Sequence, residues 1–146
     1  MSTSRVSIRF FGEALDPSVV TRVLGAEPTT YYRKGDKRMS PDGRVYEQKW
    51  GAWIIAAPER SPEAVDEQLA GLFGALTPDL EVWLALASRF DSDVFCGLFM
   101  DDSNEGFSLL PTTLRALADR QLEIGFDIYD PVDEDDDTRP VERHKG

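Results

Sequence analysis

The feature that most constrains the fold is an apolar run at residues 94–100, which contains no charged side chain. A run of this length fits one strand and falls far short of the ~20 residues that a helix needs to cross a bilayer. Because the run does not alternate with polar residues, we predict a central strand that is covered on both faces or nearly so. The other strongly apolar stretch, residues 82–87, is also short, so the sequence predicts no membrane helix.

The chain before this run predicts a strand, a helix and further strands. Residues 6–12 alternate between apolar and polar side chains, which is typical of a strand with one face on a core. A short helix is expected between Asp16, a good N-cap, and Gly25, a good residue to end a helix. Residues 29–32 fit a short strand, and residues 45–57 fit either a hairpin or a long kinked strand.

A helical connection is predicted in the middle of the chain. Ser61 and Pro62 have the pattern of an N-cap followed by proline at the first helical position. Apolar residues then recur at helical spacing over residues 65–76, and a second helical segment is expected over residues 80–88.

The end of the chain repeats the order helix, then strand. Ser108 or a neighbour is expected to cap a helix over residues 110–118, and residues 122–129 alternate cleanly as a last strand. The predicted fold class is therefore α+β, with two β-α-β halves that form an antiparallel or mixed sheet covered by helices. We expect a ferredoxin-like arrangement with a helical connection between the halves.

Charge and composition suggest one domain and a tail. A hydrophobic fraction of 41% supports one α+β domain over residues 1–130, whereas residues 131–146 are acidic and lack apolar periodicity, which predicts a disordered tail. The net charge of -11 disfavours nucleic acid as a partner. Cys96 is the single cysteine and the N-terminus has no signal-peptide pattern, so a cytoplasmic location is expected.

Several short motifs resemble a known family. They are a strand that ends in Phe11-Gly12, a helix from Asp16-Pro17 to Leu24-Gly25, the turn Lys34-Gly35-Asp36, the pair Trp50 and Trp53, and the final strand at residues 122–129. Together they resemble the bacterial family known as domain of unknown function 4279, over roughly residues 6–129. The resemblance implies a bacterial cytoplasmic protein, and it implies no activity, cofactor or catalytic residue.

The residues that usually carry catalysis or bind metals are sparse. His144 is the single histidine and lies in the predicted tail, and Cys96 lies in the apolar run, where burial would keep its thiol inert. Residues 101–106 begin like a calcium loop, but Thr112 stands where that loop needs a bidentate glutamate. We therefore predict no catalytic residues, no metal site and no cofactor.

A basic loop at residues 31–38 is the strongest candidate for a binding site. It belongs to a longer stretch, residues 33–49, that has six bases and three acids in an acidic protein. Three interpretations of these bases are open: they pair with the protein's own acids, they contact an acidic partner or the tail, or they bind a phosphorylated ligand or RNA. The pattern of an RNA-binding central strand is absent from residues 94–100. The candidate binding residues are Tyr31, Tyr32, Arg33, Lys34, Lys37, Arg38, Trp50 and Trp53.

These observations favour a non-enzymatic interaction module that binds an acidic protein partner, with toxin neutralisation by an immunity-type protein as one form. The alternative is a protein that binds a small anionic molecule, or a carboxylate-based enzyme, with a site near the basic loop, Trp50 and Trp53. The two hypotheses predict different arrangements, since a ligand site requires the bases to converge on a cleft.

Overall fold

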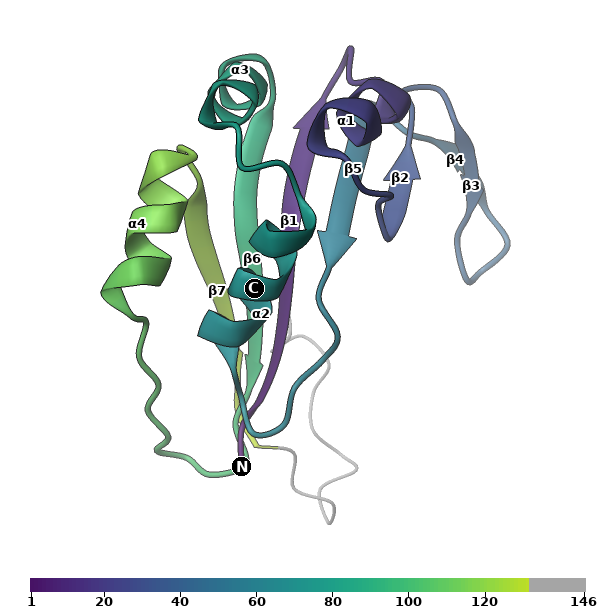
Figure 1. The fold of residues 1–146 in the computed structure, drawn as a ribbon. Helices are drawn as coiled ribbons and strands as arrows, with labels where there is room; N and C mark the ends of the chain where they lie inside the picture. The colour runs from purple at the N-terminus through teal and green to yellow at the C-terminus, as the bar shows by residue number, and fades with distance from the viewer. Residues whose placement is uncertain (132–146) are drawn as a thin grey trace.

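The computed structural model describes residues 1–131, which form a five-stranded mixed sheet, a separate two-stranded sheet and helices (Figure 1). The predicted α+β class is confirmed. The elements, in chain order, are β1 (Thr3–Gly12), α1 (Pro17–Leu24), β2 (Thr30–Tyr32), β3 (Lys37–Met39), β4 (Val45–Glu47), β5 (Gly51–Ala56), α2 (Val65–Ala75), α3 (Leu80–Arg89), β6 (Asp91–Phe99), α4 (Pro111–Asp119) and β7 (Glu123–Tyr129).

The large sheet has the strand order β2-β5-β1-β6-β7, with β1 at its centre. Strand β1 is antiparallel to both β5 and β6, whereas β6 and β7 are parallel neighbours joined through α4. The mixed sheet is as predicted. The two halves differ in their strand pairing, because β1 and β5 are antiparallel whereas β6 and β7 are parallel. The ferredoxin-like detail stays a prediction. Residues 45–57 resolve into β4, which forms a hairpin with β3, and β5, which joins the large sheet.

The hydrophobic core lies between the helices and one face of the sheet. Alternate residues of β1, including Ile8 and Phe10, are fully buried, and their register partners Ile55 and Trp53 lie on the same face. Leu24, Leu69 and Trp83 complete this core from the helices, as do the other buried apolar residues. Burial of this face is the main stabilising contribution, because it removes the largest apolar side chains from water.

Among residues 1–131, no helix lies on the second face of the sheet (Figure 1), whereas we expected residues 94–100 to be covered on both faces or nearly so. Val94, Cys96 and Leu98 are buried, whereas Phe95 and Phe99 on the other face are only partly buried. Guanidinium groups cover these rings, with Arg9 at 4.8 Å from the centre of Phe95 and Arg5 at 5.0 Å from that of Phe99. Arginines from the neighbouring strand therefore provide the cover on this face of β6.

Helix α1 begins and ends as predicted. The Asp16 side chain accepts a hydrogen bond from the Ser18 backbone N–H at 3.0 Å, and Pro17 is the first helical residue. Gly25 ends the helix with φ of +86°, a left-handed conformation that costs glycine little.

Helix α2 does not begin at Pro62, so the prediction of Ser61 as its N-cap was wrong. The helix begins at Val65, after Ala64. The backbone N–H of Ala64 donates to the Ser4 hydroxyl at 3.0 Å, and Gln68 in the first turns bonds the same serine. A side chain from the start of β1 therefore determines where this helix begins.

Helix α4 is also capped by a distant side chain, which corrects the prediction that Ser108 or a neighbour caps it. Its N-cap position is Leu110, followed by Pro111. The Asp66 carboxylate on α2 accepts hydrogen bonds from the Leu110 backbone N–H at 3.0 Å and from the Thr113 hydroxyl. The Asp66 carboxylate thus accepts a backbone N–H at the start of α4 and links α2 to α4.

Residues 132–146 lie outside the described range, and with them most of the predicted acidic tail and His144. Within residues 1–131, no single helix is long and apolar enough to span a membrane, and α2 and α3 meet that criterion only as a pair bent by 101°.

The Cys96 thiol provides a test of this core. Burial raises the pKa of the Cys96 thiol to about 11, with a smaller contribution from the charge of Glu63. We expect an aromatic disulfide reagent at about pH 8 to label native Cys96 far more slowly than the denatured chain, because the thiolate is the reactive form. Equal labelling rates in the two states, measured by absorbance, would contradict this burial.

Candidate functional site

Tyr31 and Tyr32 lie on β2, an edge strand of the large sheet, and point to opposite faces. Tyr31 is 58% exposed on the helical side and lines a small hollow with Pro17 and Thr21 of α1. Tyr32 lies on the open side, where the Arg38 guanidinium is 5.4 Å from the centre of its ring. The two adjacent tyrosines therefore do not form one stacking surface.

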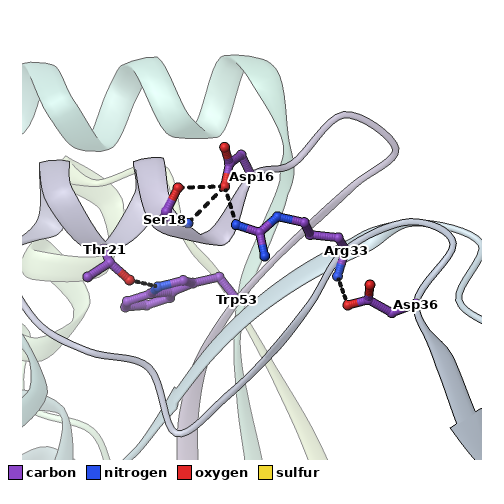
Figure 2. Close-up of polar contacts among 6 residues, drawn as sticks. All are labelled: Asp16, Ser18, Thr21, Arg33, Asp36 and Trp53. Carbon is purple, nitrogen blue, oxygen red and sulfur yellow. Dashed lines mark hydrogen bonds and ion pairs between the residues drawn. The ribbon is translucent and has the colours of Figure 1, made fainter.

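Two carboxylates, one on each side of Arg33, hold this residue in place (Figure 2). Its guanidinium donates to Asp16 at 3.0 Å, and its backbone N–H donates to Asp36 at 2.8 Å. Asp16 therefore serves two purposes, since the same oxygen that caps α1 also fixes the basic loop.

Lys34 is also paired with a carboxylate of the protein. Its ammonium lies 2.6 Å from a carboxylate oxygen of Glu13, just after β1. Arg33 and Lys34 thus contact the protein's own acids, while Lys37 and Arg38 belong to the β3–β4 hairpin. The structure therefore does not bring the four predicted bases together around one cleft.

Asp16 gives a pH-dependent prediction. Hydrogen bonds from Ser18 lower the pKa of Asp16, and the charge of Arg33 adds to this effect. Because the folded-state pKa is depressed, the stabilisation is present above the ordinary carboxyl pKa and is lost as the pH falls through the folded value. We expect Asp16→Ala to lower Tm at neutral pH, and the difference from the parent protein to shrink on acidification. A Tm difference that is independent of pH, or equal to that of the exposed control Asp102→Ala, would contradict this role.

The β3–β4 hairpin stands apart from the large sheet (Figure 1). Hydrogen bonds of 2.8 Å between Gly35 and Gln48, and between Gln48 and Asp36, close its base. Every residue of its two strands is exposed. Its outer part is therefore an accessible surface with little support from the core.

The hairpin strands place apolar side chains opposite one another. Met39 and Val45 are register partners, exposed by 70% and 62%, so they share one face of the hairpin. Arg38 and Tyr46 are partners on the other face. The hairpin thus places exposed apolar groups next to charged side chains.

Trp50 and Trp53 occupy different environments. Trp53 is completely buried, packs edge-to-face on Phe10 at 5.9 Å between ring centres, and donates from Nε1 to the Thr21 hydroxyl at 3.0 Å (Figure 2). Trp50 is 50% exposed just before β5. The chain packs closely against Leu15 at the next residue, Gly51, because a Cβ there would lie 2.5 Å from the Leu15 carbonyl oxygen. Trp50 is available to a ligand, whereas Trp53 is part of the core.

A cleft of about 650 Å³ lies beside Trp50. Its lining comes from three separate segments: the end of β1, the β4–β5 connection and the start of β6. The lining residues are Phe11, Gly12, Glu13, Lys49, Trp50 and Asp91. Sequence reasoning identified only Trp50 among the candidate residues here, because no local motif links the strand ends that meet in the fold.

The loop at residues 101–106 uses the carboxylates of Asp101 and Glu105 in contacts within the protein. Glu105 accepts hydrogen bonds from the backbone N–H groups of Asp101 and Asp102, and Asp101 pairs with the amino group of Met1. Within residues 1–131, no group of three or more His, Cys, Asp or Glu side chains is arranged to hold a metal ion.

Comparison with known proteins gives one informative result. A family model described as "Domain of unknown function (DUF4279)" matches residues 2–131. No curated protein and no solved structure matches the chain.

Proposed function

We propose that this chain, which belongs to the DUF4279 family, is a non-enzymatic interaction module of the bacterial cytoplasm that docks an acidic protein partner through its hairpin. The observation that carries this proposal is the exposed apolar pair Met39 and Val45 on a hairpin outside the large sheet. Toxin neutralisation by an immunity-type protein is one form of this function, by analogy alone.

The charge around the hairpin supports the choice of partner. Residues 36–47 contain three bases, Lys37, Arg38 and Arg44, and three acids, Asp36, Asp42 and Glu47, so the hairpin lacks the excess of acids that gives the whole protein a net charge of -11. Arg44 is 87% exposed and has only the neighbouring Asp42 as an ion-pair partner among the described residues. An acidic partner with an apolar spot complements both features, because charge guides the encounter and apolar burial stabilises the complex.

Site-specific photo-crosslinking tests this function. A photoreactive residue in place of Val45 is expected to capture a defined protein in source cells, and one at Leu84 on α3, which is 43% exposed, is expected not to do so. Lys37→Glu combined with Arg38→Glu should abolish the adduct, whereas Arg115→Glu on α4 should not. Identical adducts at positions 45 and 84, or insensitivity to the charge reversal, would refute hairpin docking.

A second candidate function is the binding of a small molecule, and the cleft beside Trp50 favours it. Its volume lies within the range of ordinary ligand sites.

A further inference from the structure

The lining of the cleft beside Trp50 includes two opposite charges, those of Lys49 and Asp91. Within residues 1–131, neither the Lys49 ammonium nor the Asp91 carboxylate has an ion-pair partner. Glu13 also lines the cleft, but Lys34 already neutralises its charge at 2.6 Å. As far as residues 1–131 are concerned, the cleft therefore offers a cation and an anion that are not in an ion pair.

Lys49 and Asp91 enter the cleft from different parts of the fold. Lys49 lies in the β4–β5 connection, and Asp91 is the first residue of β6. Strand β1 separates β5 from β6 in the sheet, and Phe11 near its end pairs with Asp91 in the register of β1 and β6. The two charges are thus presented by segments on either side of β1, with the Phe11 ring between these segments.

The apolar part of the lining consists of Trp50 and Phe11. The indole of Trp50 is half-exposed, so one part of it is available for a ring or another flat apolar group. Arg9 lies over Phe11, at 5.3 Å from the ring centre, and pairs with Asp93, so this arginine does not neutralise Asp91.

We propose that this cleft binds a small zwitterion with a flat apolar group, chemically an aromatic amino acid. Asp91 receives the ammonium group, Lys49 receives the carboxylate, and Trp50 and Phe11 contact the ring. This inference rests on the second candidate function and revises its ligand class, because the sequence suggested a purely anionic compound. Charge-assisted hydrogen bonds at both ends of the ligand provide selectivity. A ligand that lacks one of the two charges leaves either Lys49 or Asp91 without a partner in the complex.

Three related probes test the proposal: L-phenylalanine, its amide, which lacks the carboxylate, and N-acetyl-L-phenylalanine, which lacks the ammonium group. The indole N–H signals in NMR spectra report binding, with internal controls. Trp53 and Trp83 donate to Thr21 and to the Thr77 carbonyl, so their signals should stay constant while that of Trp50 moves. We expect L-phenylalanine to bind at least about tenfold more tightly than either derivative.

Two substitutions assign the charges. Lys49→Met should remove the preference for L-phenylalanine over the amide and keep the preference over the N-acetyl compound, and Asp91→Asn should do the reverse. The control Lys37→Met, on the hairpin, should change neither.

The possible results separate the ligand class from the existence of the site. If the N-acetyl compound binds as tightly as L-phenylalanine, the zwitterion proposal is overturned while a small-molecule site at Trp50 is retained. If none of the three probes moves the Trp50 signal at about 10 mM, both are overturned. Hairpin docking is independent of either outcome.

Discussion

Trp53→Ala is expected to lower the free energy of unfolding by about 3–5 kcal/mol. The side chain is completely buried at the centre of the core, and its removal leaves a large cavity under α1. It also removes the edge-to-face contact with Phe10 and the hydrogen bond to Thr21. Chemical denaturation followed by far-UV circular dichroism measures the loss without depending on tryptophan fluorescence.

Trp50→Ala is the matched control, because the two tryptophans are three residues apart in sequence and differ in burial. We expect this substitution to change stability by less than about 1 kcal/mol. If Trp53→Ala does not fold, Trp53→Phe should still show a clear loss, since it deletes the indole N–H and part of the ring. Equal losses at positions 50 and 53 would show that the assignment of Trp53 to the core and Trp50 to the cleft is wrong.

Gln68→Leu is expected to cost about 2–4 kcal/mol, although leucine is similar in size and more apolar. The Gln68 amide donates to the carbonyl oxygens of Ser4 at 3.0 Å and Pro58 at 2.9 Å, and it accepts a hydrogen bond from the Ser4 hydroxyl at 2.6 Å. Leucine satisfies none of these groups, and Gln68 is only 5% exposed, so water cannot readily replace the amide.

The neighbouring residue Glu67 provides the control for Gln68. Its side chain is 70% exposed and pairs with Arg60, so Glu67→Ala should cost at most about 1 kcal/mol. The same denaturation experiment measures both variants. A Gln68→Leu protein as stable as the parent would mean that the buried amide does not join β1 to α2.

The sequence predicted the elements well wherever the determining interactions are local. The alternation in β1 and the Asp16 cap and Gly25 end of α1 involve neighbours in sequence, and the structure confirms them. The starts of α2 and α4 were mispredicted because distant side chains determine them. Ser4 binds the N–H of Ala64, and Asp66 takes the place expected of Ser108.

The candidate site was predictable only in part, for the same reason. The composition of the basic loop is visible in the sequence, but the carboxylates that pair with the side chains of Arg33 and Lys34 lie 17 and 21 residues away. The cleft residue Asp91 lies farther still along the chain, and strand pairing alone places it beside Phe11. Nothing in the local pattern of residues 45–57 distinguishes Trp50 from Trp53, which the fold separates into surface and core.

Titration calorimetry with the protein captured at position 45 tests hairpin docking most directly. We predict that Lys37→Glu with Arg38→Glu, and separately Met39→Ser with Val45→Ser, each weaken binding at least about tenfold, and that rising salt weakens the parent complex. These side chains are exposed, so the variants should keep the stability of the parent. Unchanged affinity in both double variants would contradict the proposal that the hairpin is the docking surface.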